Sequence, residues 1–314
     1  MFKRVLLLAS CALNCWVGST GHAQVVPRPI PQNRLVINNL TLFRHNPIGL
    51  ENQLRLGFAH RLYEANDSRA LRDNFVWLGT YLRVNPASLR TAAMIELQPL
   101  SLVNLRFSAE YLRFYGNFTF VQSRGDAGGD LADTTMKANK LGALGNYSAG
   151  GVHLTFEPLI QAKVGPIAVR SRGFVGWFDM DLQRGDRVWY EATLDTALPG
   201  KGLVFANDFD VIYQRPMDEA LLSLGVRVSS VMPQYQGDQV PAVDGAPENS
   251  HHRMGLLAAY TFFDRGYSSF EKPSLLLICS WYLQHRYRTG QDVARAMPYV
   301  VLGFAFQSDL LDPK

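Results

Sequence analysis

Charged side chains recur in this sequence at positions where they alternate with apolar ones. Arg227 stands between Val226 and Val228, and Lys163 stands between Ala162 and Val164. If such segments are strands, the alternation places the charges on one face. The polar residues of this face are Gln53, Arg55, Arg61, Arg106, Glu110, Glu157, Lys163, Arg170, Arg172, Asp208, Asp210, Arg227, Arg253 and Arg286.

Two kinds of interior fit such a face. In this set basic groups outnumber acids by 9 to 4. A water-filled lumen with that lining would favour anions or polar solutes. Alternatively, the charges pair or are solvated within a narrow barrel and merely fill it. The sequence leaves both interpretations open.

Catalytic chemistry has less support in the sequence. His60 shares a face with Leu56 and Phe58, and His285 follows Leu283, so we expect both imidazoles near strand ends, at the level of lipid headgroups. Lipid hydrolysis would need a serine beside such a histidine on the same face. None of the alternating segments supplies a Ser-x-x-His or Gly-x-Ser-x-Gly setting, so we predict no enzyme and keep a lipid hydrolase as a minor alternative.

Metal and cofactor sites are not expected either. Asp126, Asp130 and Asp133 do not have the spacing of a calcium loop, and we interpret them as solvated loop acids. His251 and His252 have no cysteine or carboxylate at ligand spacing. No phosphate-binding loop or dinucleotide glycine pattern is present.

The segments that carry these residues have the period of strands. Alternation runs for about 10 to 14 residues at a time, and mean hydropathy is near zero, at −0.06. A soluble sandwich would point the apolar faces inward, whereas a transmembrane barrel would point them to lipid. The segment lengths and the aromatic residues near segment ends favour the membrane barrel. The aromatic residues expected at the membrane interfaces are Trp77, Tyr81, Tyr111, Phe114, Tyr115, Trp177, Trp189, Tyr190, Tyr213 and Tyr260.

The N-terminus predicts export. Lys3 and Arg4 precede an apolar run over 5–17, and small residues allow cleavage after Ala23, so residues 1–23 are expected to be a signal peptide. A lipoprotein signal ending at Cys11 is the weaker alternative. Residues 24–33, with three prolines, are expected to form a periplasmic lead-in, 34–308 the barrel, and 309–314 a C-terminal tail. Cys279, in an apolar run, is expected to be an inert packing residue.

The last strand carries a more specific resemblance. Residues 297–308, MPYVVLGFAFQS, resemble the C-terminal β-signal of bacterial outer-membrane proteins, except that Phe306 is not the final residue. The resemblance implies a porin-like barrel in the bacterial outer membrane and recognition by the barrel-assembly machinery.

We therefore predict an all-β fold, an antiparallel transmembrane barrel of about 12 strands, with 10 to 14 as the range. The expected strands are 34–44, 50–63, 74–85, 88–99, 102–115, 148–163, 167–181, 204–214, 219–232, 251–264, 273–287 and 297–308. This even count puts both termini in the periplasm and the long connections 116–147, 182–203 and 233–250 outside. We interpret 182–203 as a loop, although 187–196 could be a strand, and 116–147 could form a constriction or plug.

The expected function is passive passage of small polar or anionic solutes, without a cofactor. A closed structural barrel that anchors or partners other envelope proteins is the alternative. A formal net charge of +4 with no basic cluster argues against nucleic acid. The expected partners are outer-membrane lipid, the assembly machinery and other envelope proteins.

Overall fold

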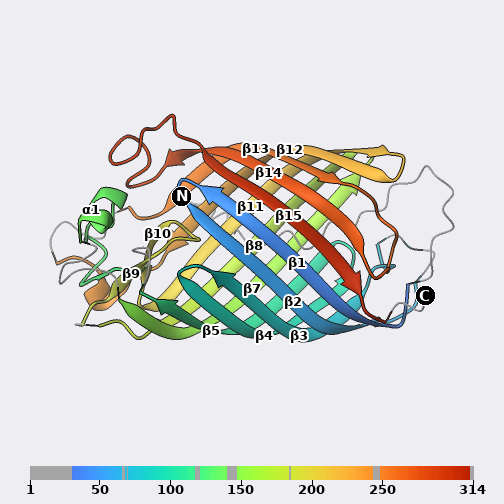
Figure 1. Cartoon of the computed structure of the whole chain (residues 1–314), viewed down its shortest axis with the longest axis horizontal. Helices are drawn as coiled ribbons and strands as arrows, with labels where there is room; N and C mark the ends of the chain where they lie inside the picture. The colour runs from blue at the N-terminus through green and yellow to red at the C-terminus, as the bar shows by residue number, and fades with distance from the viewer. Residues whose placement is uncertain are drawn as a thin grey trace, which may run out of the picture.

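Twelve long strands close into one barrel in the computed structural model (Figure 1). The structure describes residues 30–65, 68, 70–116, 121–139, 147–183, 185–242 and 248–311. The predicted signal peptide, most of the lead-in and the last residues of the tail lie outside this part of the chain. The prediction of an antiparallel barrel of about twelve strands is confirmed.

Each barrel strand pairs antiparallel with its two neighbours, and β1 closes the ring by pairing with both β2 and β15. The ends of the predicted and observed strands agree within three residues. The barrel strands are β1 (Asn33–His45), β2 (Gly49–His60), β3 (Phe75–Asn85), β4 (Ser88–Leu100), β5 (Val103–Tyr115), β7 (Ser148–Val164), β8 (Ile167–Met180), β11 (Lys201–Met217), β12 (Ala220–Pro233), β13 (His251–Thr261), β14 (Glu271–Gln284) and β15 (Tyr299–Asp309).

Strand β5 shows how the sequence pattern becomes an inside and an outside. Arg106, Ser108 and Glu110 are buried, whereas the intervening Phe107 and Tyr111 are exposed at 47% and 53%. Successive side chains of a strand point to opposite faces, so the polar set lies in the barrel interior and the apolar set outside.

The two ends of the barrel differ in their connections. At one end of the barrel, here called the turn end, β1 begins and β15 ends. Tight turns lie at this end as well, such as the one at Gly165, whose φ of 58° suits glycine. At the other end, the loop end, lie the long connections 116–147, 181–200, 234–250 and 285–298. The predicted grouping of the three long connections at one end is confirmed.

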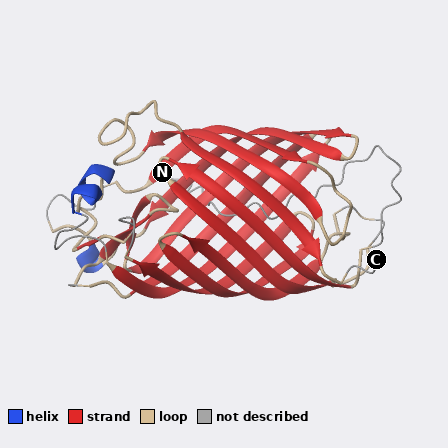
Figure 2. Cartoon of the chain, in the orientation of Figure 1, coloured by secondary structure: helices blue, strands red, loops and turns tan. Residues whose placement is uncertain are grey.

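A small second sheet lies at the loop end, where Figure 2 shows further strands and helices beside the barrel. It contains β6 (Ser123–Arg124), β9 (Val188–Glu191) and β10 (Thr196–Pro199), in the order β10-β9-β6. The helix α1 (Asp133–Ala138) and the short turn η2 (Gly237–Gln239) belong to neighbouring loops. The interpretation of 182–203 as a plain loop was therefore wrong, but the segment adds no strand to the barrel.

The hairpin of β9 and β10, residues 188–199, escaped the sequence pattern because all eight of its strand residues are buried. A strand covered on both faces has no alternation to detect. Within the described residues, none of the helices is long and apolar enough to cross a membrane.

Candidate functional site

The first feature of the interior is a chain of ion pairs around Glu96 of β4. Its carboxylate contacts Arg55 of β2 and lies 3.1 Å from Nη2 of Arg106 on β5. Arg106 also lies 3.2 Å from Glu157 of β7. Asn104 donates a 2.8 Å hydrogen bond to the other oxygen of Glu96. These groups are buried, and each buried charge therefore has an opposite charge beside it.

A second chain centres on Asp210 of β11. Strand register places Arg170 and Arg227 directly opposite it, on β8 and β12. Arg170 Nε donates to Asp210 at 2.8 Å, and Arg227 Nε donates at 2.7 Å. Arg227 also lies 2.8 Å from Asp208. Two carboxylates and two guanidinium groups thus balance one another across three strands.

A third group of contacts lies nearer the loop end. Glu110 accepts a 3.2 Å contact from His153, whose ring stacks on Phe178 at a centroid distance of 3.8 Å. Glu51 lies 3.5 Å from Arg83 and accepts a 2.6 Å hydrogen bond from Gln53.

Most of the lining residues expected from the sequence lie inside the barrel. The buried ones are Arg55, Arg61, Arg106, Glu110, Glu157, Arg170, Arg172, Asp208, Asp210, Arg227 and Arg253. Lys163 is half-buried and donates a 2.6 Å hydrogen bond to Gln214. The placement of Arg286 was wrong: β14 ends at Gln284, and Arg286 lies in the loop beyond, where it donates to the backbone of Ala127 and Gly128.

The sequence reasoning also missed interior charges on the first four strands: Arg44, Glu51, Arg83, Arg90 and Glu96. Glu51 alternates with Gln53 and Arg55, so period-2 counting could have found it. The added acid Glu96 pairs with the predicted Arg55 and Arg106, and Glu51 pairs with Arg83. Basic side chains still outnumber acidic ones, but many of them form ion pairs within the wall.

The β9–β10 hairpin fills the loop end of the interior. One side packs its Trp189 edge-on against Phe114 and Phe178 of the wall, at 5.6 and 5.7 Å. The other side meets polar wall groups, since Arg90 pairs with Glu191 and Arg44 donates to the Ala192 carbonyl at 3.1 Å. The segment that the sequence allowed to form a constriction or plug, 116–147, contributes only β6 and a cover over this hairpin among its described residues.

Asp195, in the turn of the hairpin, is the centre of the polar contacts. Arg288 donates to it from Nε at 2.6 Å and from Nη2 at 2.9 Å. The hydroxyls of Tyr190 and Tyr282 donate at 2.6 and 2.5 Å, and His285 Nε2 lies 2.8 Å from the Asp195 carbonyl. We call these five residues the Asp195 cluster.

Electrostatics keep the cluster charged. Burial would raise the pKa of Asp195, but Arg288 and His285 hold it well below its usual range. Burial opposes the charge of Arg288 as well, yet Asp195 raises the pKa of that guanidinium. Burial and the neighbouring Asp195 raise the pKa of Tyr190 well above its usual value, so its hydroxyl remains a donor.

Of the two histidines singled out from the sequence, only His60 lies where it was expected. His285 is buried in the Asp195 cluster rather than at lipid headgroups, and its Nδ1 accepts from the Tyr287 amide at 3.0 Å. His60 does lie at a strand end, exposed and 2.7 Å from Asn33. An arrangement that sequence spacing missed is the pair of Ser230 and His252, whose Oγ and Nδ1 are 2.9 Å apart across β12 and β13.

The expected loop acids are held by the protein itself. Asp130 accepts from the Ala132 amide and the Thr135 hydroxyl, Asp126 accepts from the Gly128 amide, and Asp133 pairs with Arg288. In the described part of the chain no cluster of histidine, cysteine and acidic residues has the geometry of a metal site.

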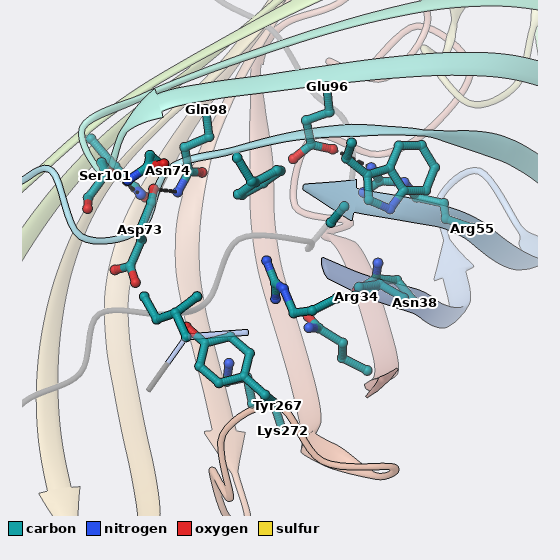
Figure 3. A pocket seen from close by; sticks show the side chains of 17 residues that line it. Arg34, Asn38, Arg55, Asp73, Asn74, Glu96, Gln98, Ser101, Tyr267 and Lys272 are labelled. Carbon is teal, nitrogen blue, oxygen red and sulfur yellow. Dashed lines mark hydrogen bonds and ion pairs between the residues drawn. The ribbon is translucent and has the colours of Figure 1, made fainter. Parts of the chain in front are cut away.

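The turn end holds a cavity of about 120 Å³ (Figure 3). Its lining comes from β1 to β4, β7, β14, β15 and the connections at that end. In the close-up, Arg34 and Asp73 reach into the space from opposite sides, Tyr267 lies below them, and the Arg55–Glu96 pair forms part of the wall.

The outer surface of the barrel is apolar. Large side chains on the outward faces include Leu78, Ile160, Leu224, Leu256 and Leu277, exposed at 64, 61, 46, 62 and 42%. Such a continuous apolar belt on a closed barrel faces lipid, because the closed ring satisfies every backbone group internally. The structure has the fold of a transmembrane β-barrel of the outer-membrane type.

Comparisons with solved structures return barrels of the same kind at very low identity. The chain is similar to the beta domain of the Bordetella autotransporter BrkA, with 8% identity, a TM-score of 0.44, and coverage of 89% of this chain and 99% of that one. It is also similar to the translocator domain of autotransporter NalP from Neisseria meningitidis, with 10% identity, a TM-score of 0.40, and coverage of 90% of each chain. A third similar structure is LpxR from Salmonella typhimurium, with 9% identity, a TM-score of 0.38, and coverage of 87% of this chain and 99% of that one. No family model and no curated protein matches the sequence.

The aromatic residues of the outer-membrane barrel are divided between two roles. Tyr111, Tyr115 and Tyr213 are exposed on the outward faces, as expected for membrane interfaces. The interface assignment was wrong for Trp77, Tyr81, Phe114, Trp189 and Tyr190, which are buried inside. Inside, Trp77 lies 5.0 Å from the Arg55 guanidinium, so part of the aromatic content packs against the charged interior.

Proposed function

We propose that the protein is a closed barrel that anchors or partners other envelope proteins through its ends, rather than a porin-like passive channel. The observation that carries this proposal is the burial of the β9–β10 hairpin on both sides. Trp189 packs on wall aromatics on one side, while Glu191 and Asp195 are held by buried arginines on the other. A loop that swings aside would leave one of these surfaces exposed.

The paired interior also supports closure. Arg55, Arg106, Arg170 and Arg227 each contact a carboxylate of the wall. An anion entering the lumen would compete with those carboxylates and would leave them buried without a partner. The charges therefore serve the packing of a narrow barrel, and selectivity for anions is not expected.

Swelling of proteoliposomes tests the proposal. Vesicles carrying the refolded chain from residue 24 should swell no faster in arabinose or sodium acetate than vesicles without protein. As a matched control, a chain in which 188–199 is replaced by a short Gly-Ser linker should swell faster. Rapid swelling with the intact chain would contradict closure and would return the passive channel to first place.

Lipid ester hydrolysis is a second candidate function, favoured by the Ser230–His252 pair. Both residues continue the outward-facing alternation near the loop end, at the level of the outer leaflet, and their side chains are hydrogen-bonded. A histidine in that position accepts the proton of a serine hydroxyl as it attacks an ester carbonyl. Ser230 is only 5% exposed, so the bonded pair also satisfies two polar groups at the membrane surface.

Release of fatty acid from vesicles of a defined phospholipid distinguishes these roles. If the pair is catalytic, Ser230→Ala abolishes release, whereas Ser269→Ala at the turn end has no effect. If the intact chain releases no more fatty acid than the Ser230→Ala variant, the hydrolase candidate fails.

A further inference from the structure

The cavity at the turn end contains an arginine that forms no ion pair with a carboxylate of the described residues. Arg34 of β1 is half-buried, and its guanidinium lies 4.9 Å from the ring centre of Tyr267 and 5.8 Å from that of Phe75. Within the described residues the guanidinium has no carboxylate in ion-pair range and no hydrogen-bond acceptor. Its planar fork is a good match for a carboxylate.

The other side of the cavity offers acceptors. Asp73 reaches toward the space from the β2–β3 connection, and its nearest cation among the described residues is Arg72, with Nε 3.5 Å away. Gln161 donates its amide nitrogen to the Ser101 carbonyl at 2.9 Å, which leaves its side-chain oxygen to accept a bond. A positively charged hydrogen-bond donor, such as an ammonium group, would fit between these two acceptors.

The remaining charges of the lining are already paired. Arg55 contacts Glu96, and Lys272 lies 3.7 Å from Asp264 and 3.9 Å from Glu271. Burial raises the pKa of Tyr267 to about 12, so its phenol is neutral and its hydroxyl is a donor at neutral pH. The cavity thus presents one guanidinium and one carboxylate on opposite sides of a space large enough for a molecule of a few heavy atoms.

We propose that this cavity binds a small zwitterion of the amino-acid class from the turn end, with its carboxylate on Arg34 and its ammonium group on Asp73. This binding role does not depend on whether the barrel is closed at its loop end. An anion alone would leave its methyl end facing Asp73, and a cation alone would face Arg34, so the complete zwitterion should bind best.

Saturation-transfer NMR on the refolded chain from residue 24 in micelles tests the proposal with three probes. Alanine has both charged groups, propionate has only the carboxylate, and ethylamine has only the ammonium group. We expect alanine to bind at least about tenfold more tightly than either analogue. Equal binding of propionate and alanine would overturn the zwitterion assignment, and binding of none of the three would overturn the site.

Two variants locate the binding. Arg34→Gln should weaken alanine binding at least about tenfold, and Asp73→Asn should weaken alanine but not propionate. Arg215→Gln, an exposed arginine at the same end outside the cavity, is the matched control and should bind alanine unchanged. Circular dichroism confirms that each variant is folded. If Arg34→Gln folds and binds alanine as the intact chain does, the proposal is wrong.

Discussion

Arg288 and Asp195 are joined by two hydrogen bonds, of 2.6 and 2.9 Å, although they are 93 positions apart in the sequence. Arg288 belongs to the connection between β14 and β15, and Asp195 to the turn of the hairpin. Both side chains are almost fully buried, at 2% and 1% exposure. This contact ties the segment that fills the barrel mouth to the loop between β14 and β15.

Asp195→Asn should loosen the hairpin without unfolding the barrel. The change leaves the buried Arg288 charge with less compensation, which costs about 3–5 kcal/mol for a buried pair. Amide hydrogen exchange within 188–199 should accelerate at least about 100-fold, while exchange in β4 and β5 is unchanged.

Asp238→Asn is the matched control for that variant. It breaks the exposed 2.5 Å contact between Arg187 and Asp238, which is worth at most about 1 kcal/mol. If exchange in the hairpin is the same in Asp195→Asn, Asp238→Asn and the intact chain, the Asp195 cluster does not hold the hairpin.

The contribution of Asp195 to hairpin stability should persist in moderate acid. The pKa of Asp195 is held well below its usual range, so ionisation of this carboxyl stabilises the folded state at pH values above its unfolded pKa. That contribution is lost only as the pH falls from there through the low folded pKa. The difference in hydrogen exchange of 188–199 between the intact chain and Asp195→Asn should therefore be constant between pH 7 and pH 5. A difference that shrinks within that range would contradict the assignment.

The loop end should face the outside of the cell. Gly290 and Gly266 are matched insertion sites, since both have positive φ and open space around the Cα, but they lie at opposite ends. An epitope tag inserted at Gly290 should be stained by antibody on intact cells, whereas a tag at Gly266 should be stained only after the outer membrane is opened. The reverse staining pattern would mean that the turn end, and not the loop end, faces the outside of the cell.

The apolar belt predicts that a charged side chain on the outer surface destabilises the barrel more, the closer it lies to the centre of the bilayer. Leu256, 62% exposed near the middle of β13, should lie near the centre of the bilayer, and Leu256→Arg should destabilise the barrel by about 2–4 kcal/mol. Val164, 81% exposed at the end of β7, is the control, and Val164→Arg should cost about 0–1 kcal/mol. Equal costs in reversible unfolding from lipid vesicles would argue against this placement of the belt.

The barrel itself could be predicted because its strands obey a simple local rule. Strand β5 alternates Arg106 and Glu110 with Phe107 and Tyr111, and every strand that separates lipid from the interior must alternate in this way. Because successive strands run in opposite directions, every second connection lies at the same end of the barrel, and the order of the strands then predicts which connections are grouped.

The closure of the mouth could not be predicted in the same way. The hairpin around Asp195 is buried on both faces, and, apart from Tyr190, the partners of that carboxylate come from β14 and the loop after it. The acid Glu96 was overlooked for a related reason: its importance comes from Arg55, two strands away, and not from its neighbours in sequence. Long-range pairing of this kind leaves no local periodicity.

Single-channel conductance of the refolded chain from residue 24 in a planar bilayer tests closure most directly. Insertion is verified independently by protease protection in vesicles. We predict that the intact chain inserts and remains silent, and that replacement of 188–199 by a Gly-Ser linker produces discrete current steps. Discrete, reproducible steps from the intact chain would contradict the account, because an open path would then run past the Asp195 cluster.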